Sequence, residues 1–160
     1  MEKIKKVLIL GSTGMLGHQV QLRLADKKEY EIIDLSYRTK FTEKTIICNI
    51  TDKPAFSKII QDLSPDIIVN CIGVLIKGST TNPANAIYIN SYFPHFLRQI
   101  GEENNAKVIH ISTDCVFSGK KGAYTLDDFK DGEDIYAKSK SLGEIIHDDH
   151  LTLRTSIIGP

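Results

Sequence analysis

Short, nearly continuous apolar runs alternate with longer segments of helical period, and this alternation limits the fold of the chain more than any other feature. Six runs have the length of β-strands: 6–10, 31–35, 45–48, 67–71, 107–111 and 151–154. Most are unbroken stretches of Val, Ile and Leu, as expected for parallel strands that are covered on both faces. The alternation therefore predicts an α/β fold built on a doubly wound parallel sheet.

The segments between these runs contain apolar residues at helical spacing. We expect helices over 14–25, 54–63, 83–104 and about 135–147, with Asn82 as the N-cap of the third. This third helix should bury one apolar stripe, made of Ile87, Phe93, Phe96, Leu97 and Ile100. The polar segment 114–133 is long for a loop in a compact α/β domain, which indicates a functional loop.

Composition and charge exclude several classes of protein. The 160 residues suit one domain, and their formal net charge of zero gives no basic surface for nucleic acid or for an anionic membrane. The first apolar run ends at Gly11, too early for a signal peptide or a membrane span, so we expect a cytoplasmic protein. Cys48, Cys71 and Cys115 lack metal-like spacing, which predicts buried free thiols and no metal site.

A cluster of glycines follows the first apolar run, in Gly11-Ser12-Thr13-Gly14-Met15-Leu16-Gly17. Glycine allows a tight turn and lets a pyrophosphate approach the backbone N–H groups at a helix N-terminus. A tight turn without a ligand is the alternative, but the first turn between strand and helix is where a dinucleotide fingerprint belongs. We therefore predict a Rossmann fold whose cofactor contacts include Gly11, Thr13, Gly14, Met15, Leu16 and Gly17.

The end of the second apolar run bears on the choice of cofactor. An acidic residue there would bind a ribose 2′-hydroxyl, whereas an arginine would accommodate a 2′-phosphate. Asp34 falls one or two residues too early to reach the ribose, which leaves Ser36 at the selecting position with Arg38 nearby. We predict that NADP(H) is preferred, with NAD(H) as the alternative.

Candidate catalytic residues lie near the ends of the fifth apolar run and the last helix. Tyr136 and Lys140 form a YxxxK pattern on one helical face, where an ammonium should stabilise the phenolate and lower the pKa of the tyrosine. Ser112 and Thr113 follow a strand at its carboxyl end, where a hydroxyl can bond a substrate carbonyl oxygen. Such hydroxyls also cap helices and begin turns, so each motif is weak when taken alone.

Taken in order, these motifs resemble the extended short-chain dehydrogenase/reductase family, and most of all its dTDP-4-dehydrorhamnose reductase-like nucleotide-sugar reductases. The resemblance extends over essentially all 160 residues and rests on 11–17, 49–52, 65–71, Asn90, 112–119, 136–140, 143–144 and 154–156. Three departures put the rhamnose-pathway substrate in doubt. Cys115 replaces a tyrosine, Leu126 stands where a loop acid is usual, and 78–81 replaces a more acidic segment.

The resemblance implies a role for individual residues. Thr113, Tyr136 and Lys140 would form the catalytic triad, with Tyr136 as proton donor and Lys140 also holding the nicotinamide ribose. Further cofactor contacts would come from Asn49, Ile50, Asp52, Cys71, Ile72, Gly73, Asn90 and Ser112. Asn90 would help to order the active site, although a satisfied interior amide is an equal interpretation.

The resemblance also implies an activity and a domain organisation. Residues 1–160 would be the NAD(P)-binding domain, truncated before a small substrate-binding domain. The expected function is NAD(P)H-dependent reduction of a 4-keto nucleotide-sugar in surface-polysaccharide biosynthesis, with a homodimer as the expected assembly. Two alternatives stay open: an epimerase or dehydratase with tightly bound NAD, and a non-catalytic NADP-binding regulatory subunit.

Overall fold

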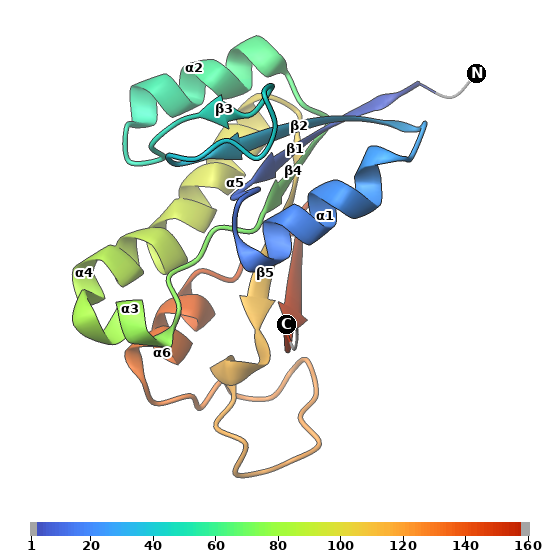
Figure 1. The fold of residues 1–160 in the computed structure, drawn as a ribbon. Coiled ribbons are helices and arrows are strands. Elements are labelled where there is room, and N and C mark those ends of the chain that lie inside the picture. Colours follow the sequence, from blue (N-terminus) through green and yellow to red (C-terminus); the bar gives the residue numbers. More distant parts are fainter. Residues whose placement is uncertain (1–2, 158–160) are drawn as a thin grey trace.

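The computed structural model describes residues 3–157, which form one parallel sheet with helices on both faces (Figure 1). The sheet has six strands in the order β3-β2-β1-β4-β5-β6. The strands are β1 (Lys5–Leu10), β2 (Tyr30–Ser36), β3 (Ile46–Ile47), β4 (Ile67–Asn70), β5 (Lys107–Thr113) and β6 (Leu151–Thr155). This confirms the predicted doubly wound α/β fold, although β3 is only two residues long.

The helices agree less closely with the expected boundaries. They are α1 (Met15–Ala25), α2 (Lys53–Leu63), α3 (Ile76–Thr81), α4 (Pro83–Ala86), the π-helix η1 (Ile87–Tyr92), α5 (Phe93–Glu103), the 3₁₀-helix η2 (Asp114–Val116) and α6 (Ile135–Leu142). Helix α3 was not expected, and the third expected helix is divided into α4, η1 and α5. Asn82 caps α4 as predicted, accepting a hydrogen bond from the Asn85 amide.

Two apolar cores cover the two faces of the sheet. Leu8 and Leu10 of β1 point into the larger core, which includes Phe56 of α2 and Phe93 of α5. Val7 and Ile9 point into the smaller core, against which Val20 and Leu24 of α1 pack. Burial on both faces explains why β1 is a continuous apolar run rather than an alternating one.

The winding of the chain reverses at β1, which pairs with β2 on one side and with β4 on the other. Leu10 at the end of β1 is in register with Asn70 at the end of β4. The loops that leave these two ends turn to opposite faces of the sheet, so a crevice opens at the carboxyl edge. Ligands of open α/β sheets bind at this position, and the candidate site lies there.

The π-helix η1 changes which side chains face the core. A π-turn inserts an extra residue per turn, so the side-chain phase of a regular α-helix is lost across it. Ile87, expected in the core, is therefore exposed, while Ile89 and Asn90 are buried. The rest of the expected stripe is confirmed by Phe93, Leu97 and Ile100, and Phe96 packs on its border.

Helix α6 ends five residues before the expected end, because it meets η1 there. A Cβ atom at Gly143 would lie 1.8 Å from the Asn90 carbonyl oxygen, so the two backbones touch at this point. The prediction of three buried thiols is also wrong in part. Cys48 is buried and Cys71 is half-buried, but Cys115 is exposed. Within residues 3–157 no helix is both long and apolar enough to cross a membrane.

Candidate active site

The N-terminus of α1 differs from those of α2 and α6. Asp52 caps α2 and Asp134 caps α6, each through its side chain. The N-cap of α1 is Gly14, which offers no side-chain cap, and the first turn contains no acidic residue. The backbone N–H groups and the positive dipole end of α1 are therefore left for an external anion.

The glycines of this turn meet distinct steric demands. Gly11 has a φ of +82°, a conformation that side chains disfavour. A Cβ atom at Gly17 would lie 2.0 Å from the Gly11 carbonyl oxygen, so only glycine allows α1 to approach β1 this closely. Gly14 lines the cavities described below, so its missing side chain leaves the backbone open to a ligand.

Two adjoining cavities of about 590 and 570 Å³ lie along the carboxyl edge of the sheet. Both are lined by Gly14 and by Cys71, Ile72 and Gly73 at the end of β4, so together they form one cleft over the glycine turn. Such a volume is in the range of small-molecule and cofactor sites. An elongated ligand would therefore cross the sheet edge at Gly14, with its two ends in different cavities.

The cavity on the β2 side contains several of the expected cofactor contacts. It is lined by Gly11 and Thr13 of the glycine turn and by Asn49 and Ile50 after β3. Tyr37, which follows β2, also lines it and was missed by sequence reasoning. The sequence signal that could have identified Tyr37 was an aromatic residue shortly after the second apolar run.

Three other expected contacts of this cavity are placed elsewhere. The Ser36 side chain is buried and its hydroxyl donates to the Thr39 carbonyl, so it turns into its own loop. Asp52 accepts a hydrogen bond from the Ala55 amide as the cap of α2, because a short acid before a helix satisfies its first N–H groups. Arg38 is not a lining residue; its guanidinium lies 4.4 Å from the centre of the exposed Tyr37 ring.

The other cavity brings the three candidate catalytic residues together. Thr113 at the end of β5, Tyr136 in the first turn of α6 and Lys140 one turn later all line it. Met15 and Leu16 of the glycine turn and Ser112 line it too. Residues separated by more than a hundred positions thus face one space.

The protonation of this group differs from the sequence expectation. Burial raises the pKa of Tyr136, while a hydrogen bond with the Thr113 hydroxyl opposes the increase. Burial also lowers the pKa of Lys140 from 10.5 to about 8, and its ammonium donates to the Ile111 carbonyl at 2.6 Å. The expected lowering of the tyrosine pKa is therefore wrong for this structure, because desolvation raises the pKa of Tyr136 and the nearby charges of Asp114 and Asp134 raise it further.

Asn90 lies beneath the cleft and not in it. Its amide nitrogen donates to the Val74 carbonyl at 2.9 Å and to the Ser139 hydroxyl at 3.1 Å, and its side-chain oxygen accepts from the Val74 amide at 2.8 Å. The side chain is fully buried. Asn90 thus connects the segment after β4 to α6 as a satisfied interior amide, and direct contact with a cofactor is not supported.

The remaining wall of the catalytic cavity was not predicted. It is formed by α3, by the start of η2 and by the segment after β6, through Leu75, Ile76, Lys77, Asp114, Cys115, Thr155, Ser156 and Ile157. Cys115 had been discussed as a departure from the family signature, and Asp114, Thr155 and Ser156 lie in motifs 112–119 and 154–156 without a role of their own. Leu75, Ile76 and Lys77 were missed because they belong to the unexpected helix α3 and its N-cap, whose short polar sequence has no clear helical period.

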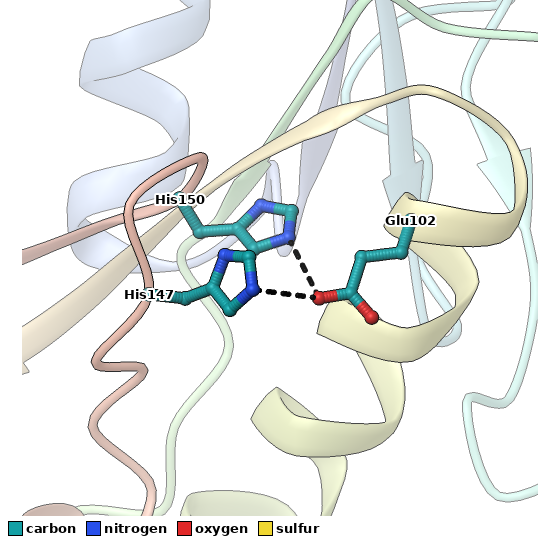
Figure 2. A group of neighbouring side chains, drawn as sticks. All are labelled: Glu102, His147 and His150. Atoms are coloured by element: carbon teal, nitrogen blue, oxygen red, sulfur yellow. Dashed lines mark ion pairs between the residues drawn. The ribbon is translucent and has the colours of Figure 1, made fainter.

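A second group of titratable side chains lies away from this cleft. Glu102 is at the end of α5, and His147 and His150 lie in the segment before β6, so the group is at the amino-terminal edge of the sheet (Figure 2). The ligand atoms of these three side chains lie within 4.8 Å of one another, which makes the group a candidate metal site in the described part of the chain. The two histidine Nε2 atoms lie 3.5 and 3.6 Å from Glu102 Oε1.

The hydrogen bonds of the two rings argue against metal coordination. His147 Nδ1 accepts from the Asp149 amide at 3.3 Å, and His150 Nδ1 accepts from the Val108 amide at 3.1 Å. A neutral imidazole that accepts at Nδ1 has its proton on Nε2. Each ring thus carries its proton on Nε2, the nitrogen that faces Glu102, whereas a metal would require a lone pair on that nitrogen.

Comparison with known proteins agrees with this geometry. Residues 5–158 match the model of the RmlD substrate binding domain. The chain is 30% identical to dTDP-4-dehydrorhamnose reductase of Aggregatibacter actinomycetemcomitans, over 87% of this chain and 45% of that protein. It is also 28% identical to methionine adenosyltransferase 2 subunit beta of Danio rerio, over 88% of this chain and 42% of that protein.

A solved structure supports the same relationship. The dTDP-4-dehydrorhamnose reductase of Bacillus anthracis strain Ames, in complex with NADP, superimposes with a TM-score of 0.81 at 27% identity, over 96% of this chain and 54% of that one. The chain thus spans about half the length of the relatives it matches. Because the family match extends over nearly the whole sequence, this chain belongs to the RmlD substrate-binding domain family, within the extended short-chain dehydrogenases/reductases.

Proposed function

We propose that the protein is an NAD(P)H-dependent reductase of a 4-keto nucleotide-sugar that acts in surface-polysaccharide biosynthesis in the cytoplasm. The observation that supports this most is the single cavity lined by Thr113, Tyr136 and Lys140 next to an uncapped glycine turn. The relatives named dTDP-4-dehydrorhamnose reductase support the substrate class. The homodimer expected from the sequence stays a prediction.

The cleft fits a dinucleotide that extends from Tyr37 to Tyr136. The first turn of α1 would hold the diphosphate, Asn49 and Ile50 would border the adenosine end, and Gly73 would leave space beneath the other end. Among residues 3–157 no carboxylate lines the β2-side cavity, so a ribose 2′-phosphate would meet no like charge there. This favours NADP(H) over NAD(H). When bound, the nicotinamide would supply the hydride.

The residues of the catalytic cavity would handle the proton. Thr113 would donate a hydrogen bond to the substrate oxygen as negative charge develops on it. Tyr136 would then donate its phenolic proton to that oxygen, and its raised pKa keeps this proton in place at neutral pH. Lys140 would support the phenolate that remains, and half of this lysine is charged at a pH of about 8.

Substituting Tyr136→Phe in the full natural chain tests this function. The variant should reduce a 4-keto nucleotide-sugar at least about 100-fold more slowly than the wild type, because a general acid contributes about 10²–10⁴-fold. NADPH affinity, measured by fluorescence titration, should stay within about threefold, since the ring is retained. Undiminished turnover by Tyr136→Phe would contradict the proposal.

Two alternatives are separated by the same assays. An epimerase or dehydratase would purify with tightly bound NAD and would consume no added NADPH, whereas a reductase consumes it in stoichiometric amounts. A regulatory subunit is favoured by one observation, the similarity to methionine adenosyltransferase 2 subunit beta. It would bind NADPH without turnover and would co-purify with a large partner enzyme.

A further inference from the structure

Glu144 forms a buried polar centre directly behind the catalytic cavity. Glu144 comes directly after Gly143, the C-cap of α6, and only 6% of its surface is exposed. Its Oε1 atom accepts from the Ser112 hydroxyl at 2.8 Å and from Arg154 Nε at 2.7 Å. Its Oε2 atom accepts from Arg154 Nη2 at 2.8 Å and from Lys130 Nζ at 2.5 Å. One carboxylate therefore meets three side chains from three different elements.

Each of these partners belongs to a part of the chain that borders the cleft. Ser112 precedes Thr113 at the end of β5, so its bond to Glu144 fixes the strand end that presents the Thr113 hydroxyl. Arg154 lies on β6 in register with Ser112. The third partner, Lys130, belongs to the long segment between η2 and α6, which Figure 1 shows extending beyond the carboxyl edge of the sheet.

This long segment has few other connections to the sheet. Arg154 reaches it twice, through a hydrogen bond to the Leu126 carbonyl at 3.4 Å and through its guanidinium 5.0 Å from the centre of the Phe117 ring. Phe117 stacks on Tyr124 at 4.5 Å between ring centres, within the segment itself. The Glu144–Arg154 pair therefore connects residues 117–133 to the sheet through Phe117, Leu126 and Lys130.

Glu144 remains ionised at every pH at which the protein would work. Burial acts to raise the pKa of Glu144, but hydrogen bonds from Arg154, Lys130 and Ser112 lower it to about 2. A carboxylate that is buried, bidentate with arginine and fully hydrogen-bonded has a fixed geometry. The side chain is thus suited to hold its neighbours in place and unsuited to donate a proton.

We propose that Glu144 is a positioning residue for the proposed reduction, holding Thr113 in its catalytic position through Ser112 and attaching residues 117–133 beside the cleft through Lys130. The inference rests on the proposed function, since it assigns a role in that same site. Glu144 does not line the cavity, so its effect on the reaction passes through these two partners. Misplacement of a reacting group by about 1 Å can cost about 100-fold in rate.

The test compares Glu144→Gln with the wild type in the full natural chain. We expect kcat, expressed per NADPH-binding site, to fall at least about tenfold, while the Kd for NADPH changes by less than about threefold. A merely structural role would reduce the number of NADPH-binding sites and leave kcat per site unchanged. Lys130→Met, which leaves the Arg154 pair intact, should instead raise KM and increase proteolytic cleavage between 117 and 133.

A double variant with Ser112→Ala shows whether the effect passes through Ser112. If it does, adding Ser112→Ala to Glu144→Gln should lower kcat little further, because both changes remove the same connection. Should Glu144→Gln fail to fold, Glu144→Asp is measured in the same way, since it keeps the charge and shortens the reach. A kcat per site within about twofold of wild type, or effects that multiply in the double variant, would overturn the proposal.

Two reference variants keep the outcomes distinct. Glu102→Gln removes the same charge and an ion pair with arginine, here Arg98 at 2.5 Å, at the amino-terminal edge of the sheet. Its kcat per site should equal that of the wild type. If the wild type itself turns over no substrate, the proposed function fails. If it does and Tyr136→Phe does not, the result for Glu144→Gln decides the positioning role alone.

Discussion

Replacing Gly17 by alanine tests whether the close contact between α1 and β1 determines cofactor binding. The new Cβ atom would lie 2.0 Å from the Gly11 carbonyl oxygen and 2.7 Å from the Gly11 carbonyl carbon. Since Cβ atoms essentially never approach other heavy atoms within 3.0 Å, the first turn of α1 and the Gly11 peptide must separate by at least about 1 Å. Both groups are backbone, so no side-chain rotation relieves the overlap.

The cost of this separation follows from two effects. Overpacking of a well-packed contact costs about 1–3 kcal/mol of unfolding free energy, although alanine is otherwise favoured over glycine in a helix by up to about 1 kcal/mol. A shift of about 1 Å also takes an N–H···O bond from about 2.9 Å beyond hydrogen-bonding distance. Losing one such bond to a charged phosphate costs about 1.5–3 kcal/mol, or roughly 10- to 150-fold in Kd.

Fluorescence titration with NADPH and urea unfolding followed by circular dichroism would measure both effects. Gln19→Ala is the matched control, because Gln19 is exposed on the same helix and the change adds no steric contact. We expect Gly17→Ala to bind NADPH at least about tenfold more weakly and Gln19→Ala to match the wild type. If Gly17→Ala keeps wild-type affinity and stability, the steric argument for this glycine is refuted.

Three further predictions follow from the site. Because the pKa of Lys140 is about 8 and the charged form supports the phenolate, kcat/KM for reduction should fall as the pH rises through about 8, and a flat profile between pH 7 and 9 would contradict this. The pKa of Glu144 is lowered from 4.5 to about 2, so its ionisation stabilises the fold above pH 4.5, and this contribution is lost as the pH falls toward 2. The difference in unfolding free energy between wild type and Glu144→Gln should therefore shrink by about 2 kcal/mol from pH 7 to pH 3, and a constant difference in urea titrations would contradict it. Tyr37→Asp should shift the preference from NADPH toward NADH, because it places a carboxylate in the adenosine-side cavity, and unchanged relative Kd values would argue against this cavity as the adenosine site.

The topology could be predicted because strands covered on both faces leave a pattern that is independent of their neighbours. The runs at β1, β4 and β5 are rich in Val, Ile and Leu, and their boundaries were predicted within two residues. The glycine turn was equally predictable, because the φ of Gly11 and the contact at Gly17 leave no other residue type at those positions. In each case a local sequence feature determines the local structure.

Other features depend on contacts between distant segments and were not predictable from local pattern. The π-turn at η1 rotates Ile87 out of the core and brings Asn90 beneath the cleft, where it bonds to Val74 and Ser139. The end of α6 is determined by the contact of Gly143 with η1, 53 residues earlier in the chain. Ser36 was expected at the position that selects the cofactor, but its hydroxyl donates a hydrogen bond to the carbonyl of Thr39 in its own loop.

The pKa of Tyr136 shows why a motif predicts adjacency better than it predicts electrostatics. The YxxxK spacing places Tyr136 and Lys140 in one cavity, as expected. The sign of the pKa shift depends instead on how deeply each group is buried, and burial here raises the tyrosine pKa and lowers that of the lysine. Both shifts favour the neutral forms, so at neutral pH the phenol retains the proton that reduction consumes. Oxidation would require Tyr136 to lose this proton first, against its desolvation. For the proposed reductase, Tyr136 is thus suited to donate a proton at neutral pH, and a pH increase should accelerate the reverse reaction relative to the forward one.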